Sequence, residues 1–357
     1  MGKHRNTDLP PAHDGSAVRN VVLAMIGLTI VVVGMIASYS GAFAKPTLHH
    51  MAVAVAAPQQ VLDGIRGQDA LAVTEVGDAA AARQQVYERH TDAAFAVAPN
   101  GEMKIYVAGG GGRSVATAAE TVGRGIAAKA GLTASVEDVA PASAGDPSGT
   151  VEFYAIIFIS IGATVGATVV GRIMGTVRKP ATLAQRTMTL AGYSALLAAG
   201  VTLYVDVILG ALTAHTWQLF GVLWLYAMAV GGAVTGVAAA FGTVASLALT
   251  LFLVVIGNAA AAGPVGRPLL SGFYSTFTAI VPQGSGVSLV RSVEYFGGNG
   301  AQTPLATLAI WGAAGCLLAV LATAARVNYR ALYERYLPGF AGRDRAVLRP
   351  RFLSPTD

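Results

Sequence analysis

Long apolar stretches without a single charged residue dominate the chain. They lie between Arg19 and Lys45, Glu152 and Arg172, Asp206 and Arg267, and Glu294 and Arg326. A membrane-spanning helix needs about 20 predominantly apolar residues. The pattern therefore predicts an α-helical polytopic membrane protein with six spans, at about 20–43, 153–173, 187–212, 217–239, 243–262 and 303–325. Only glycines separate the fourth and fifth of these spans, and small residues of this kind permit close helix approach.

Residues 44–152 show a different pattern, with short apolar runs alternating with more polar helical stretches. Strands are predicted at 51–57, 70–76, 93–99, 103–109 and 134–139, and helices at 78–90 and 112–131. Asp78 precedes the first of these helices and is a suitable N-cap. The alternation indicates a small α/β domain, and the Pro- and Gly-containing segment 141–150 is expected to be its linker to the next span.

Composition agrees with a membrane location. Charged residues make up only 12% of the chain, whereas soluble domains carry about 25%. The lone cysteine, Cys316, lies in an apolar run, which excludes a disulfide framework and a cysteine metal site. The apolar run 21–37 is longer than the roughly 7–15 residues of a signal peptide core, so we expect a retained helix despite the cleavage-like Ala42-Phe43-Ala44.

Basic residues gather in three segments that the six-span prediction places on one side of the membrane. These are the tail 1–19, the loop with Arg172, Arg178, Lys179 and Arg186, and the tail 326–357. The positive-inside rule makes this side cytoplasmic. Both termini are then cytoplasmic and residues 44–152 extracytoplasmic, and the five-helix membrane domain covers 153–325. Because the basic residues lie beside membrane segments, they do not indicate nucleic-acid binding.

Local motifs for catalysis or cofactor binding are weak. The chain has no phosphate-binding G-x-x-x-x-G-K-[ST] sequence. Gly109–Gly112 precede a predicted helix, which could favour anion binding, but a turn is the better interpretation. His49 and His50 have no neighbouring ligand cluster. We therefore expect no enzyme activity, no metal site and no cofactor on this chain.

Asp206 is the only acidic residue inside a predicted span. Intramembrane carboxylates are costly and often functional. Since Asp206 lies toward the outer end of the third span, water can reach it there. A structural polar contact, a place in a substrate or proton path, and a misplaced span boundary remain open as explanations.

Residues 271–297 suit neither a span nor a soluble loop. The short apolar segment 271–281 is followed by Pro282, Gly284 and Gly286 and then by an amphipathic helical pattern. Apolar segments of about 10–14 residues are often re-entrant or interfacial. We expect a re-entrant hairpin in the outer leaflet, turning at 282–284. Its helix should expose Arg291 and Glu294 at the wet rim, three residues apart and weakly paired.

This succession of features resembles the type-2 ABC transporter permeases with an ectodomain. The resemblance is carried by DAAAARQQVYERHTDAAFAVAPNGEMKIYVAGGGG and by FYSTFTAIVPQGSGVSLVRSVEYFGG, and it covers nearly the whole chain. The sequence looks most similar to the branch of phage-infection-protein and nitrosoguanidine-resistance membrane proteins. The resemblance implies that 172–186 is a coupling loop for a separate ATPase and that 271–297 forms an outer gate.

Three hypotheses follow for the function. The first is a permease subunit of a bacterial plasma-membrane exporter for a lipid-like or drug-like substrate, dimeric (with itself or a related chain) and powered by ATP on a partner. The second is a proton-coupled exporter that uses Asp206. The third is a non-transporting surface or secretion-associated component whose ectodomain binds a partner.

Overall fold

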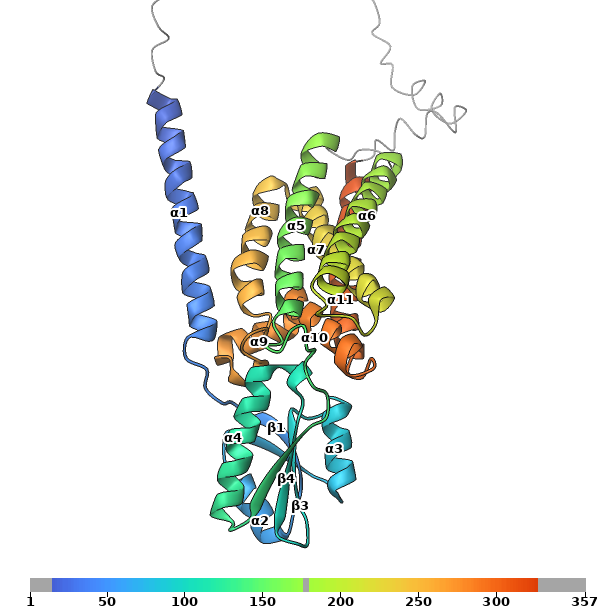
Figure 1. The fold of residues 1–357 in the computed structure, drawn as a ribbon. Coiled ribbons are helices and arrows are strands. Elements are labelled where there is room, and N and C mark those ends of the chain that lie inside the picture. Colours follow the sequence, from blue (N-terminus) through green and yellow to red (C-terminus); the bar gives the residue numbers. More distant parts are fainter. Residues whose placement is uncertain (1–14, 176–179, 327–357) are drawn as a thin grey trace, which may run out of the picture.

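The computed structural model describes residues 15–175 and 180–326. It is mostly helical, with 69% helix, and it contains one five-stranded sheet. Figure 1 shows a bundle of long helices at one end of the molecule and a sheet domain at the other, with α9 and α10 between them. We call the end of the bundle that faces away from the sheet domain the far end.

Five helices are long and apolar enough to cross a membrane. They are α1 (Gly15–Phe43), α5 (Val151–Met174), α6 (Pro180–Thr202) with its continuation η2 (Leu203–Ile208), α7 (Thr216–Phe241) and α11 (Gln302–Arg326). These helices correspond to five of the six predicted spans. The mostly helical fold is therefore confirmed, and in the described residues five helices could span a membrane.

The predicted fifth span, 243–262, is shorter in the structure. Helix α8 (Thr243–Phe252) continues in the π-helical turn η3 (Leu253–Gly257), and the helix ends soon afterwards. At about 1.5 Å per residue, this segment is well short of the ~30 Å hydrocarbon core of a bilayer. Its crossing of the membrane stays a prediction, and its expected end at residue 262 is wrong.

Close packing of α7 holds the bundle together. In its most apolar 18-residue window, 67% of α7 is buried. Gly236 lies directly against the backbone of Gly315 in α11, so a Cβ at residue 236 would collide with that backbone. The small residues expected to permit close helix approach therefore do so.

Helix α1 stands apart from this bundle in Figure 1. Only 6% of its apolar window is buried. Its last turns are held by two side-chain hydrogen bonds: Ser38 Oγ donates to the Val255 carbonyl at 2.8 Å, and Tyr274 Oη donates to Ser38 Oγ at 3.2 Å. The contacts of α1 are thus concentrated near the sheet domain.

The sheet has the strand order β2-β1-β3-β4-β5. Its strands are β1 (Met51–Ala56), β2 (Leu71–Glu75), β3 (Ala93–Val97), β4 (Glu102–Val107) and β5 (Thr133–Asp138). All neighbours are parallel except β3 and β4, which form an antiparallel pair. All five predicted strands are present, within about two residues of their expected ends.

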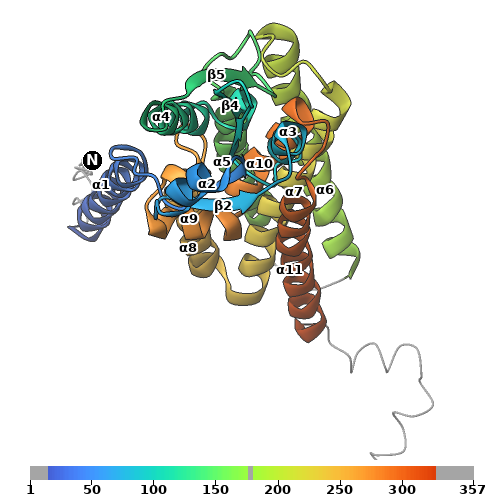
Figure 2. The ribbon, with the colours of Figure 1, turned by 90° about the horizontal axis from the view of Figure 1, so that it is seen from below.

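Helices cover both faces of the sheet, as Figure 2 shows for α3 (Ala79–Tyr87) and α4 (Arg113–Lys129). Val53 and Val55 pack toward α2 (Gln59–Arg66) and α4, whereas Ala54 packs toward α3. This alternation is the period-2 pattern of a strand. Asp78 caps α3 by accepting a 2.7 Å bond from the Ala81 amide, as predicted. Helix α2 was not predicted.

Two short helices connect the bundle to the sheet domain: α9 (Gly272–Ile280) and α10 (Pro282–Tyr295). The turn between them is at Val281, which has an extended backbone, and Pro282 occupies the first turn of α10. The predicted turn at 282–284 is therefore wrong. Proline favours an extended residue before it and suits the first helical position, so α10 begins at Pro282 and includes Gly284 and Gly286.

The directions of the long apolar helices determine which of their ends lie together. In Figure 1, α1 begins, α5 ends, α6 begins and α11 ends at the far end. The described residues that flank the three basic segments therefore lie at one end of the bundle. The sheet domain lies at the opposite end.

Candidate functional site

Helix α10 is buried between the bundle and the sheet domain. All of its residues from Pro282 to Glu294 are buried except Ser288, which is half-buried. Gln283 donates hydrogen bonds to Ser160 Oγ and to the Leu253 carbonyl, both at 3.0 Å. The predicted wet, amphipathic helix is therefore wrong, because its polar side also packs against protein.

A buried ion pair joins α10 to the start of α5. Arg291 Nε lies 2.7 Å from Glu152 Oε1, and the two side chains are 4% and 0% exposed. Glu294 does not pair with Arg291; it accepts a 2.9 Å bond from the Ala214 amide instead. The expected pairing of residues 291 and 294, and their place at a wet rim, are thus both wrong. The amphipathic pattern of this segment predicts the two faces of the helix but cannot reveal Glu152, which is distant in the sequence, as the partner of Arg291.

The remaining N–H groups of Arg291 bind backbone carbonyls from three segments. Nη1 donates to Gly111 and Ala262, both at 3.1 Å, and Nη2 donates to Gly149 at 3.3 Å and Gly263 at 3.1 Å. A guanidinium has five N–H donors, and here all five have acceptors. Arg291 therefore ties the sheet domain, its linker and the loop before α9 to α10.

The predicted turn at Gly109–Gly112 is confirmed, and it explains how the sheet domain approaches α10. Gly109–Gly111 form a short 3₁₀ turn, and Gly112 has φ +141°. A Cβ on Gly110 would collide with the ring of Tyr295. Since the Gly111 carbonyl faces Arg291, the turn offers an acceptor at this point rather than an anion site.

A second arginine, which sequence reasoning missed, binds α10 from the sheet domain. Arg89 follows α3 with φ +63°. Its guanidinium donates to the Ser288 carbonyl at 2.8 Å, to Ser292 Oγ at 2.5 Å and to Ser288 Oγ at 3.2 Å, and it lies 4.9 Å from the centre of the Phe296 ring. Burial, followed by the charge of Arg291, lowers the pKa of Arg89 to about 10. In the sequence, a basic residue after a helix looks like an ordinary solvated end.

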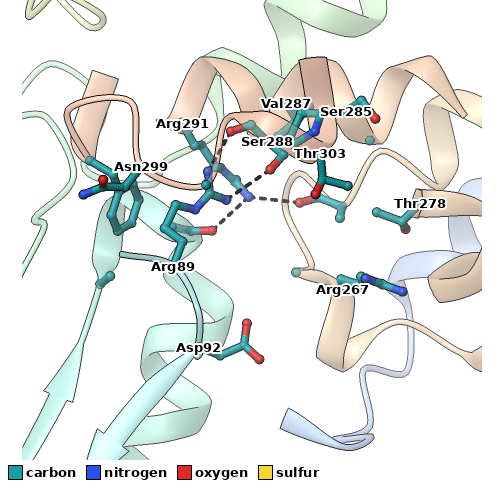
Figure 3. A pocket seen from close by; sticks show the side chains of 18 of the residues that line it. Arg89, Asp92, Arg267, Thr278, Ser285, Val287, Ser288, Arg291, Asn299 and Thr303 are labelled. Atoms are coloured by element: carbon teal, nitrogen blue, oxygen red, sulfur yellow. Dashed lines mark hydrogen bonds between the residues drawn. The ribbon is translucent and has the colours of Figure 1, made fainter. Parts of the chain in front are cut away.

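A cavity of about 820 Å³ lies beside these contacts, between the sheet domain, α9, α10 and the start of α11. Figure 3 shows Arg89, Asp92 and Arg267 around it, with Ser285 and Thr303 on the helical side. Burial raises the pKa of Asp92, partly offset by the Ala52 amide and by Arg89 and Arg267. The cavity combines charged groups, hydroxyl groups and apolar walls, which is typical of binding sites for small molecules.

The residues assigned to the gate are brought together, but mostly as packing. Gly284 lies against the Thr278 carbonyl, and Gly286 packs on Ile156 and Tyr226. Of the gate residues, Gly284 and Arg291 line the cavity. The two glycines let α10 lie close to its neighbours rather than form a loop.

Asp206 lies apart from the cavity, in the π-helical turn η2 at the end of α6. Its Oδ2 atom is buried without a hydrogen-bond partner. The chain beyond η2 returns toward α10, where Ala214 binds Glu294. Asp206 therefore lies near the sheet-domain end, in a segment where π-helical geometry often marks functional sites.

The predicted coupling loop is described in part. Arg172 is exposed in the last turn of α5. Arg186 is buried at 6% exposure, and its Nη1 donates a long 3.5 Å bond to the Gly175 carbonyl. Arg178 and Lys179 lie outside the described residues. Arg186 therefore folds back onto its own connection instead of facing solvent.

No metal centre emerges in the described parts of the chain, because no group of three His, Cys, Asp or Glu side chains is arranged to hold an ion. The imidazole of His49 forms a 2.7 Å hydrogen bond with the hydroxyl of Thr47. No protein-family model matches the chain, and neither the curated proteins nor the solved structures contain a match. Functional inference therefore depends on the geometry of the chain.

Proposed function

We propose that the chain is the permease subunit of an exporter for a lipid-like or amphipathic substrate, powered by a separate ATPase. The observation that carries the proposal is the position of α5. Its first turn contains Glu152, which holds Arg291 of α10, and its last turn contains Arg172 at the far end. A 24-residue helix is about 36 Å long, so one rigid element connects the two ends of the bundle.

In this proposal the far end is cytoplasmic and the sheet domain is an extracytoplasmic ectodomain of a bacterial plasma-membrane protein. The basic residues next to the far end support this orientation. The short α8–η3 segment serves as the fifth of the six spans in chain order. The chain that follows it completes the length needed to cross the membrane. The proposed family is the type-2 ABC permeases with an ectodomain, as the order of segments suggests.

The proposed mechanism uses α5 to move α10. An ATPase bound at 172–186 shifts the far end of α5, and the Glu152–Arg291 pair carries that shift to α10. Helices α9 and α10 then act as the outer gate, since the cavity lies between them and the sheet domain. Two such chains, identical or related, enclose the substrate path, with the exposed apolar surface of α1 in contact with lipid or the second chain.

Purification in mild detergent tests the partner. We expect an ATPase to co-purify with the full chain, and ATP to stimulate substrate export in vesicles. Arg172→Glu reverses an exposed charge at the far end and should abolish co-purification, whereas Lys129→Glu, an exposed change in the sheet domain, should not. Absence of an ATPase together with ATP-independent transport would contradict the proposal.

A proton-coupled exporter is the second candidate, favoured by the unpartnered, buried Oδ2 atom of Asp206. An unsatisfied carboxylate oxygen near the end of a span is suited to bind and release a proton. Asp206→Asn should then abolish proton-dependent export at unchanged protein level. Full activity of this variant would dismiss the candidate and leave the ATP-driven function standing.

A further inference from the structure

The cavity beside α10 is lined by arginine N–H donors that have no acceptor among the described residues. All five N–H groups of Arg291 are used: one on Nε, two on Nη1 and two on Nη2. Arg89 makes three bonds, through Nη1 and Nη2 only. Arg267 makes a single 3.3 Å bond from Nε to the Ser275 carbonyl. With five donors per guanidinium, Arg89 and Arg267 retain donors for a ligand.

The charge of the lining also favours an anion. Three arginines line the cavity, with Glu88 and Asp92 as the acidic side chains. The Glu88 carboxylate accepts a 2.7 Å bond from Gln84 and lies 3.4 Å from His90. Arg291 is neutralised by Glu152. Among the described residues, Arg89 and Arg267 form no ion pair, so both guanidinium groups can pair with an anion.

The start of α11 adds a further positive contribution. Gln302 and Thr303 belong to its first turn and line the cavity. The first amides of a helix have no partner within the helix, and the helix dipole favours an anion there. Thr303 lies on the helical side of the cavity in Figure 3.

The surroundings of the cavity distinguish a lipid from a soluble anion. Beyond the polar first turn of α11, Leu305 and Ile310 are 41% and 67% exposed, and Ile280 at the end of α9 is 54% exposed. In a membrane helix such residues face acyl chains. A molecule with its anionic head in the cavity can therefore lay its tail along α11.

We propose that this cavity binds the phosphate of a phospholipid or similar lipid-like molecule, with Arg267 as the main phosphate ligand. Arg89 contributes its remaining donors from the sheet domain, and the first turn of α11 completes the site. The inference rests on the proposed function in treating such a molecule as the exported substrate. Binding itself requires neither an ATPase nor transport.

The test uses the purified full chain in detergent, with native mass spectrometry to measure bound lipid. The probes are phosphatidylglycerol and diacylglycerol with identical acyl chains, which differ in the phosphate-containing head. We expect phosphatidylglycerol to bind at least about tenfold more tightly, because charge-assisted bonds are worth roughly 1.5–3 kcal/mol. Equal binding of the two lipids would overturn the proposal.

Arg267→Gln isolates the proposed ligand. Since Arg267 is exposed, the variant should fold normally while its phosphatidylglycerol affinity falls about tenfold, the loss of roughly 1.4 kcal/mol. Arg267→Lys keeps the charge and should recover part of the affinity. Arg113→Gln is the matched control, since Arg113 in α4 is also an exposed arginine but does not line this cavity. Unchanged affinity in Arg267→Gln would refute the assignment.

Soluble competitors separate the two sources of phosphate. Glycerol phosphate and inorganic phosphate should displace phosphatidylglycerol only at far higher concentration, because they lack the apolar tail. Displacement at concentrations similar to that of the lipid would assign the cavity to a soluble anion and overturn the lipid proposal. Lipid binding by a chain that recruits no ATPase would contradict the proposed exporter function alone.

Discussion

The two ends of the helical bundle each contain a buried arginine, and the two are held very differently. At the sheet-domain end, Arg291 has a carboxylate 2.7 Å away and four backbone carbonyls. At the far end, Arg186 has one long 3.5 Å bond, and its Nε atom is buried without a partner. Burying a charge is costly unless it is paired and hydrogen-bonded.

The difference indicates what each end does. Fully satisfied buried polar networks rigidify a structure, whereas a buried polar group left without a partner destabilises the fold. All five donors of Arg291 are satisfied, although the Oε2 atom of Glu152 is buried without a partner among the described residues. Arg291 thus fixes one arrangement of α10, the linker and the sheet domain. Arg186 has capacity left for another acceptor, as expected at an end that meets a partner.

Breaking the pair at the sheet-domain end should have the largest effect. Glu152→Gln leaves the Arg291 charge buried without compensation, which typically costs about 3–5 kcal/mol. The measurement is the free energy of unfolding in detergent. Glu120→Gln is the control, because the Glu120–Arg124 pair is exposed and such pairs contribute about 0–1 kcal/mol. Equal effects of the two substitutions would show that the buried Glu152–Arg291 pair contributes no more stability than the exposed Glu120–Arg124 pair.

The close contact of the glycine turn with α10 gives the next largest effect. Gly110→Ala forces a Cβ into the ring of Tyr295, and overpacking of this kind costs about 1–3 kcal/mol. Gly125→Ala is the matched control: Gly125 lies inside α4 with open space around its Cβ, so it should gain about 0.5–1 kcal/mol. The two unfolding free energies should change in opposite directions, and a loss in both would contradict this account of Gly110.

The sheet-domain end should also respond to pH through Asp92. Because burial raises the pKa of Asp92 above its ordinary 3.8, the folded state takes up a proton more readily than the unfolded state. The stability that this protonation contributes is present at low pH and is lost as pH rises through the raised folded pKa. Asp92→Asn should remove this component, as measured by unfolding midpoints of both proteins from pH 3.5 upward. Parallel profiles would exclude Asp92 as its source.

The smallest effect on stability is expected at the far end. Arg186→Gln removes a charge that is buried with few partners, so the unfolding free energy should change by less than about 1 kcal/mol. If the proposed exporter function holds, stimulation of a partner ATPase by this chain should nevertheless fall. A loss as large as that of Glu152→Gln would show that the far end is as firmly fixed as the other.

Local patterns in the sequence were sufficient for most secondary structure. Short apolar runs located all five strands, and the charge-free stretches located five long apolar helices in the described residues. Helix α2 was not predicted because it is only eight residues long and contains few apolar residues. The end of the predicted fifth span was misplaced because apolar residues continue to residue 262, whereas the helix ends soon after Gly257.

The candidate site was predictable only in its location. Segment 271–297 stood out as unsuited to a span, and the structure places it at the junction. The partners of Arg291 come from residues more than 25 positions away in the chain, including Glu152. No local periodicity carries that information. Arg89 was missed for the same reason, since its acceptors lie about 200 residues further on.

The sparse packing of α1 has a consequence for how the sequence of this protein can vary. Lipid tails are as apolar as leucine, so an exposed leucine gains nothing by touching protein instead. The last turns of α1, around Ser38 and Gly41, meet specific neighbours in the rest of the protein. Apolar residues in the preceding turns should therefore tolerate replacement by other apolar residues. Sequence constraint on α1 should be strongest in its final few residues.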